Sequence, residues 1–151
     1  MALKPDRIEL ADGSRIKYFM NEVAERGIVV ILDSPGGEGM DDPTATVSIP
    51  AVATGNVPAG VLMNDVVNLN LTRQHINWHR DEVQVGNKVD IIRRGVIRTN
   101  MVASGDTPGA GDAAHYGADG EFTTTTDSAR IGTFVSEKDA EGYVEVEVSI
   151  I

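Results

Sequence analysis

The chain has no cysteine, few aromatic residues and no long apolar run. Without cysteine among its 151 residues it can form neither a disulfide nor a thiolate metal site, so packing and hydrogen bonds must stabilise the fold. No stretch approaches the roughly 18 uninterrupted apolar residues of a membrane-spanning helix, and the charged N-terminal segment 1–15 lacks the apolar core of a signal peptide. We therefore expect a soluble protein that is made without an export signal.

Positive charge is also scarce. The chain contains 13 Lys and Arg against 23 Asp and Glu, which gives a formal net charge of −10. Because nucleic acids and anionic lipids are bound through neutralising cations, this balance argues against direct binding to nucleic acid or to a membrane. The length allows one sizeable hydrophobic core, so the sequence predicts a single domain over residues 1–151.

Period-two alternation is the main structural signal that is present. The segment 143–150 alternates polar residues with valine and isoleucine, which predicts a half-buried strand. A strand-like segment at 131–136 and a polar connection at 137–142 precede it, so we expect a C-terminal hairpin.

Turn signals separate several further strand-like segments. A second hairpin is predicted from Lys88–Ile92 through a turn at 93–95, with Gly95 supplying a positive φ, back through 96–102. An Asp-Gly pair between 7–10 and 15–20 predicts a third hairpin. The remaining predicted strands are 27–32, 44–49 and 61–71, the last with a bend at Asn64 and Asp65. Many short strands with turns between them predict an all-β barrel or sandwich.

Two segments rich in Gly, Asp and Pro, at 34–43 and 104–120, are predicted to be loops. Loops this long in a compact domain are commonly functional or disordered. The first has no Lys-Ser or Lys-Thr after its glycines, and the second is rich in aspartate, so neither fits a phosphate-binding loop. The aspartates Asp106, Asp112 and Asp119 are candidates for calcium ligands, but their spacing is not that of an EF-hand loop.

A metal-dependent hydrolase is one alternative that the sequence leaves open. His75 and His79 have the four-residue spacing that places two imidazoles on one helix face, and Glu82 or Asp81 is a possible third ligand. The glutamate that follows the first histidine in a metalloprotease helix is missing, and the flanking sequence is not helical in character. No nucleophile motif or catalytic pair is recognisable either. We expect no catalytic residues, no metal and no cofactor.

Charge is distributed unevenly along the chain. Segment 72–98 holds six Lys and Arg against three Asp and Glu, a net charge of +3, whereas the rest of the chain carries −13. The only tryptophan, Trp78, lies within this segment. Because Trp and Arg are enriched at the energetic centres of protein interfaces, the segment is a candidate docking surface. The alternative is a core tryptophan surrounded by solvated charges.

Short segments in a fixed order carry a family resemblance over nearly the whole chain. They are KPDR at 4–7, YFMNEVAERG at 18–27, GVLMNDVV at 60–67, LTRQH at 71–75, WHRDEVQ at 78–84, the predicted hairpin at Gly95, IGTFVS at 131–136 and DAEGY at 139–143. In this order they resemble the decoration, or cement, proteins of tailed-bacteriophage capsids.

This resemblance implies a non-enzymatic virion structural protein with a small β-barrel or β-tulip-like body, often a homotrimer. Such a protein is made in the host cytoplasm, binds the major capsid protein on the capsid exterior and stabilises the shell across capsomer boundaries. Physical chemistry fits this role separately, because an exposed strand edge, or an N-terminal arm within residues 1–15 such as 2–10, could pair with a neighbouring chain. The residues we expect to contact the shell or sister subunits are Arg73, Trp78, Arg80, Arg93 and Arg94. The alternative is a carbohydrate- or receptor-binding β module of a virion, whose site would be the two glycine-rich loops.

Overall fold

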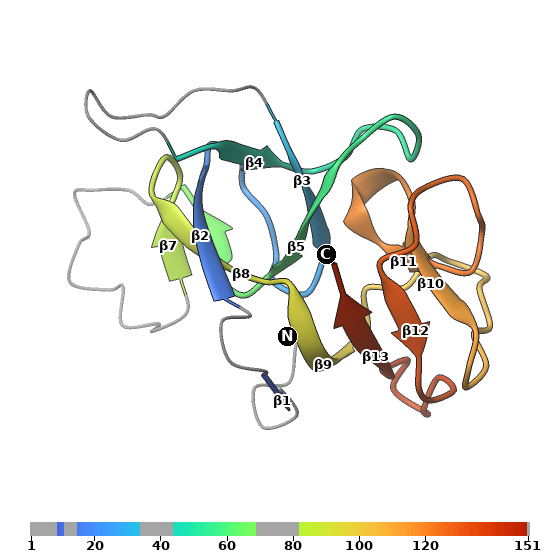
Figure 1. The fold of residues 1–151 in the computed structure, drawn as a ribbon. Helices are drawn as coiled ribbons and strands as arrows, with labels where there is room; N and C mark the ends of the chain where they lie inside the picture. The colour runs from blue at the N-terminus through green and yellow to red at the C-terminus, as the bar shows by residue number, and fades with distance from the viewer. Residues whose placement is uncertain (1–8, 11–14, 34–43, 69–81, 151) are drawn as a thin grey trace.

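A computed structural model of the chain describes residues 9–10, 15–33, 44–68 and 82–150. This part of the chain is all-β, as predicted, with one short 3₁₀ turn at Ala118–Gly120, and no helix in it is long and apolar enough to span a membrane (Figure 1). The strands are β1 (Glu9–Leu10), β2 (Arg15–Met20), β3 (Val29–Leu32), β4 (Thr46–Ser48), β5 (Pro58–Leu62), β6 (Asp65–Val67), β7 (Glu82–Gln84), β8 (Lys88–Ile92), β9 (Arg94–Thr99), β10 (Ala113–Tyr116), β11 (Phe122–Thr123), β12 (Gly132–Phe134) and β13 (Val144–Ser149).

Five strands close into a small barrel in the order β2-β4-β3-β5-β8. Strand β2 shows why this segment forms a barrel wall. Its residues alternate, so that Tyr18 and Met20 are buried inside while Arg15 and Lys17 are exposed outside. The predicted bend in 61–71 is confirmed, because the chain leaves the barrel after Leu62 and β6 pairs instead with β7.

A six-stranded sheet in the order β1-β9-β13-β12-β10-β11 packs beside the barrel (Figure 1). The predicted C-terminal hairpin is confirmed, since β12 and β13 pair antiparallel from Gly132 opposite Val148 to Phe134 opposite Val146. The alternate residues Val144, Val146 and Val148 are buried. They pack in one cluster with barrel residues such as Val29 and Ile92, so a shared apolar layer joins the sheet to the outer side of the barrel.

The predicted hairpin at 88–102 is wrong. Strand β8 pairs with β2 and β5 of the barrel, whereas β9 pairs with β1 and β13 of the sheet, so the chain crosses from one unit to the other. The physical reason is burial on different sides: Ile91 packs inside the barrel, while Ile92 and Ile97 enter the layer between barrel and sheet. Gly95 has the predicted positive φ, 149°, but lies within β9.

The N-terminal hairpin is also wrong, because β1 pairs with β9 and β2 pairs with β8. Of the predicted arm at 1–15, the described residues Glu9–Leu10 add a strand to the edge of the chain's own sheet.

The predicted loop at 104–120 needs correction too, since Ala113–Tyr116 forms β10 between β11 and β12. Its short Ala-Ala-His-Tyr sequence is weakly strand-like, and the neighbouring strands and the burial of Tyr116 hold it in the sheet. The predicted loop 34–43 lies outside the described residues.

Candidate functional site

The five predicted interface residues fall into two groups. Arg73, Trp78 and Arg80 lie outside the residues that the structure describes, and so do the candidate metal ligands His75 and His79. Arg93 and Arg94 are described, and both lie where the chain crosses from the barrel strand β8 to the sheet strand β9.

The crossover presents its two arginines differently. Arg93 is half-buried, and its Nε atom is buried without a hydrogen-bond partner among the described residues. The Arg93 carbonyl oxygen accepts a hydrogen bond from the Ile150 N–H at 2.9 Å, which ties the crossover to the end of the sheet. Arg94 is exposed and lies opposite Ser149 of β13. The fixed backbone therefore holds the Arg94 guanidinium in solvent.

Three more cations form a surface that we call the basic strip: Arg15, Lys17 and Lys88. Arg15 and Lys17 lie two residues apart on the outward face of β2, and Lys88 lies on the neighbouring strand β8, opposite Phe19. The Lys88 Nζ atom is 5.1 Å from the centre of the Phe19 ring. Asp90 also lies on this surface, with one carboxylate oxygen 3.4 Å from Arg15 and the other 3.6 Å from Lys17.

Charge counting along the sequence located only part of this surface. Lys88 lies inside the basic segment 72–98, but Arg15 and Lys17 lie far from it in sequence and are brought beside it by the pairing of β2 with β8. The alternation of Arg15 and Lys17 with Ile16 and Tyr18 was the available signal, because it predicts that both cations share the solvent face of a strand.

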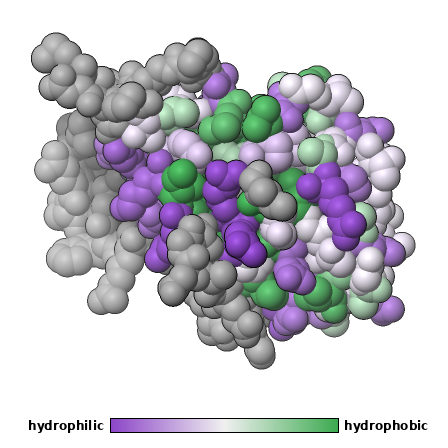
Figure 2. All heavy atoms as spheres, viewed as in Figure 1, coloured by the Kyte–Doolittle hydropathy of each residue, from purple (hydrophilic) through white to green (hydrophobic). Residues whose placement is uncertain are grey.

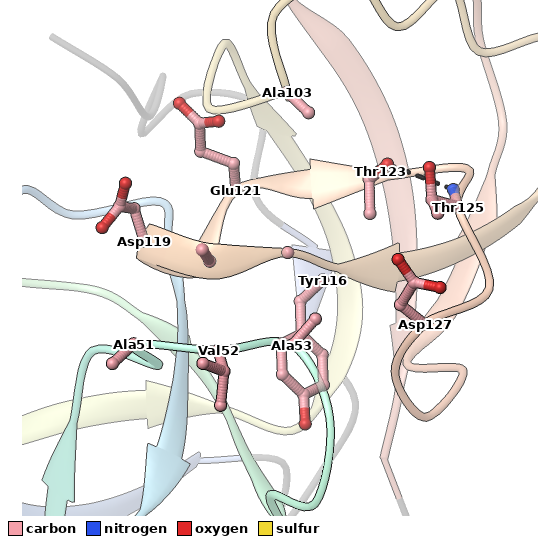
Figure 3. Close-up of a pocket in the computed structure, with 12 residues that line it drawn as sticks. Ala51, Val52, Ala53, Ala103, Tyr116, Asp119, Glu121, Thr123, Thr125 and Asp127 are labelled. Atoms are coloured by element: carbon pink, nitrogen blue, oxygen red, sulfur yellow. Dashed lines mark hydrogen bonds between the residues drawn. The ribbon is translucent and has the colours of Figure 1, made fainter.

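A cavity of about 530 Å³ opens between the connection that follows β4 and the strands β10 and β11. Figure 3 shows Ala51, Val52 and Ala53 on the lower side, with Asp119, Glu121 and Asp127 above them. We call it the acidic groove, and its lining residues are Ala51, Val52, Ala53, Ala103, Tyr116, Gly117, Ala118, Asp119, Glu121, Thr123, Thr125 and Asp127. Three of these are carboxylates and none is Lys or Arg.

Hydrogen bonds near both ends of the connection between β4 and β5, residues 49–57, hold the groove open. The Tyr116 hydroxyl donates to the Asn56 carbonyl at 3.2 Å, and the Asp119 N–H donates to the Pro50 carbonyl at 2.9 Å. The Asn56 side-chain amide closes the loop on itself by donating to the Val52 carbonyl at 2.6 Å. Tyr116 is buried, and burial raises the pKa of its phenol. It therefore acts as a neutral hydrogen-bond donor.

The wall of the groove has a constrained backbone. Asp119 has a φ of 64°, the left-handed region that few residues other than glycine adopt, and Gly120 follows it with a φ of 74°. A Cβ atom on Gly120 would lie 2.3 Å from the Val29 carbonyl oxygen, so this turn packs directly on barrel strand β3. The turn thus fixes the Asp119 carboxylate at the rim by seating the backbone against the barrel.

The candidate calcium ligands do not form one site. Asp106 accepts hydrogen bonds from Thr123 and Thr124, and Asp112 accepts one from the Gly109 N–H, so both serve local structure. Asp119 lies at the groove instead. Among the described residues no group of three or more His, Asp or Glu side chains is arranged to hold a metal ion. The glycan-binding alternative gains no support, since 34–43 is not described and β10 occupies part of 104–120.

Apolar patches on the face in Figure 2 are separated by polar side chains. In Figure 1, strand β2 of the basic strip lies at the left of the fold, whereas β10 and β11 beside the acidic groove lie at the right. A small barrel joined to a sheet does not by itself determine function, so the class of the protein follows from its family. Residues 13–149 match the model of the phage structural cement protein family that is described by E217 gp24 and Pam3 gp6. The chain belongs to this family. No curated protein matches the chain.

Proposed function

We propose that the protein binds the outer surface of a phage capsid and stabilises the shell across capsomer boundaries, without catalysing a reaction. Its membership of the structural cement family over residues 13–149, nearly the whole chain, carries this proposal. Its direct partners are the major capsid protein and other copies of itself in a homotrimer. It is made in the host cytoplasm and resides on the capsid exterior, with no contact to nucleic acid or membrane.

The crossover between β8 and β9 is the described part of the proposed contact with the shell. Arg94 is exposed there, and the Ile150-to-Arg93 hydrogen bond holds the adjacent backbone. Binding of a carboxylate by the guanidinium therefore costs side-chain entropy but requires no reordering of the backbone. Arg73, Trp78 and Arg80 complete the predicted contact set together with Arg93. Each contact need only be modest, because copies bound at many positions of one lattice hold the shell together collectively.

Occupancy on capsids that lack the protein tests this proposal. Purified wild-type chain added to such particles is expected to bind and to raise the temperature at which the shells break, both measured by electron microscopy and light scattering. The double variant Trp78→Ala with Arg80→Ala and the single variant Arg94→Glu are each expected to raise the Kd for capsids by about tenfold.

The matched control is Lys138→Glu, which makes the same change in charge as Arg94→Glu at an exposed position in the connection between β12 and β13. It is expected to bind like the wild type. Normal occupancy by both interface variants would remove this assignment of the surface. A wild-type chain that neither binds nor stabilises the shells would overturn the proposed function itself.

A further inference from the structure

We propose that copies of this chain join head to tail, with the basic strip of one copy seated in the acidic groove of the next. The inference rests on the homotrimer proposed above and assigns the two surfaces that hold it together. Both surfaces consist entirely of described residues, and they carry opposite charge.

The acidic groove combines an apolar floor with a negative rim. Asp119 and Asp127 are exposed and Glu121 is half-buried, and no ion pair with a described residue neutralises the three carboxylates. A long cationic side chain matches this chemistry, because its methylene stem can lie on the alanines while its charged head reaches the rim. The groove therefore selects lysine or arginine over a neutral or acidic side chain.

The basic strip presents three such side chains. The Arg15 side chain is 53% exposed and the Lys17 side chain 68% exposed, so both project well beyond the barrel wall. Arg15 and Lys17 share the one carboxylate of Asp90, so these three side chains carry a formal charge of +1, and Lys88 adds a further cation to the strip. Three carboxylates in the groove thus face a strip of net positive charge, which is the complementarity that selects one orientation of two copies.

Apolar contact adds to this charge pairing. Val52 and Val57 lie on the 51–57 connection beside the groove and are 59% and 61% exposed, unlike most large apolar residues in the described part of the chain. Exposed ion pairs contribute little to binding individually, so an interface here also needs apolar area. The two valines supply it on one side, and the half-buried Phe19 ring under Lys88 supplies it on the other.

The positions of the two surfaces constrain the symmetry of the assembly. Strand β2 lies on the left of the barrel in Figure 1 and pairs with β8, whereas β10 and β11 lie at the far right of the sheet. A chain therefore cannot place its own strip in its own groove. A contact between two different surfaces forms a closed ring when the rotation between successive copies closes, and an open filament when it does not. The proposed trimer is the closed ring of three copies.

Charge reversal on each surface, alone and together, tests the inference by sedimentation velocity of the purified chain at high micromolar concentration. The groove variant is Glu121→Lys with Asp127→Lys, and the strip variant is Lys17→Glu with Lys88→Glu. Asp119 is left unchanged because its left-handed backbone disfavours lysine. Wild-type protein is expected to sediment as a trimer, and each variant is expected to raise the Kd for self-association by at least about tenfold. The variant with all four changes restores opposite charges and should return to within about threefold of wild type.

The control variant is Glu137→Lys with Glu147→Lys, which changes net charge as the groove variant does but at exposed positions outside both surfaces. It should remain a trimer. Wild-type association of both charge-reversed variants, or no recovery in the fourfold variant, would overturn the groove-to-strip contact and leave the trimer standing. A monomeric wild-type chain would overturn the trimer as well, whereas attachment to capsids is measured separately by occupancy.

Discussion

Arg98 on β9 donates a hydrogen bond to the carboxylate of Asp139, which lies 41 residues later in the connection between β12 and β13. The other Asp139 oxygen accepts hydrogen bonds from the N–H groups of Glu141 and Tyr143, both at 2.9 Å. The Tyr143 N–H and then the Arg98 guanidinium are the main causes that hold the pKa of Asp139 below its usual range. One carboxylate thus closes the C-terminal hairpin and fixes it to the next strand of the sheet.

The variant Asp139→Asn is expected to lower the midpoint of urea unfolding at neutral pH, because the amide loses the charge and presents one acceptor oxygen instead of two. The folded-state pKa is lower than the unfolded one, so the stabilisation is present above the unfolded pKa of about 4 and is lost as pH falls through the folded pKa. The difference between wild type and variant should therefore shrink below about pH 4. The control Glu137→Gln, at an exposed position in the same connection, should change the midpoint little at either pH.

A separate prediction concerns Gly120, where the wall of the acidic groove contacts the barrel. Gly120→Ala places a Cβ atom 2.3 Å from the Val29 carbonyl oxygen and is expected to cost about 3 kcal/mol of unfolding free energy. Gly111→Ala is the matched control, because Gly111 also has a positive φ, 95°, but nothing lies within 4 Å of its added Cβ. It should cost only the backbone strain, about 1 kcal/mol. Equal losses in chemical denaturation would show that the close approach to Val29 is unimportant.

Much of the fold could be predicted from local pattern, but strand partners could not. The alternation in 143–150 predicted β13 and its hairpin, since one face of that strand packs in a core and the other meets solvent. The same kind of pattern in 88–102 predicted two strands correctly and their pairing wrongly. Alternation predicts which side chains are buried. It does not predict that Ile91 packs inside the barrel while Ile92 and Ile97 pack in the layer between barrel and sheet.

The candidate site shows the same limit. Arg93 and Arg94 were predicted from composition and do lie on one crossover, at least partly accessible. The basic strip and the acidic groove were missed, because each is assembled from segments far apart in sequence. Asp119 was considered as a calcium ligand, yet its place at the groove depends on the hydrogen bond to Pro50 and on close packing at Gly120. These contacts join segments far apart in sequence, so residue spacing alone does not predict them.

Asp106 gives a prediction that joins stability to a measurable pKa. Burial acts to raise the pKa of Asp106, but hydrogen bonds from the Thr123 hydroxyl at 2.6 Å and from Thr124 outweigh it, and the pKa is lowered. Thr123→Val removes, at nearly constant volume, a hydroxyl that donates to Asp106 and also accepts a hydrogen bond from the Thr125 N–H. It is expected to cost about 2 kcal/mol of unfolding free energy. The Asp106 pKa, followed by NMR, should rise in this variant. Thr123→Ser keeps the hydroxyl and should keep the low pKa, and a rise of equal size in both variants would contradict the assignment.

Tyr116 tests whether the acidic groove is preformed. Its hydroxyl donates to the Asn56 carbonyl at 3.2 Å, and its ring is 1% exposed, so Tyr116→Phe removes one hydrogen bond with little change in packing. The expected loss of unfolding free energy is about 1 kcal/mol. Hydrogen exchange of the 51–57 amides should accelerate, and self-association should weaken because the apolar edge of the groove is less well held.

Tyr18→Phe is the control, since no described residue bonds the Tyr18 hydroxyl, and it should stay within about 0.5 kcal/mol of wild type. Unchanged exchange in Tyr116→Phe would mean that other contacts, such as the bond from Asp119 to Pro50, hold the groove open without this hydroxyl.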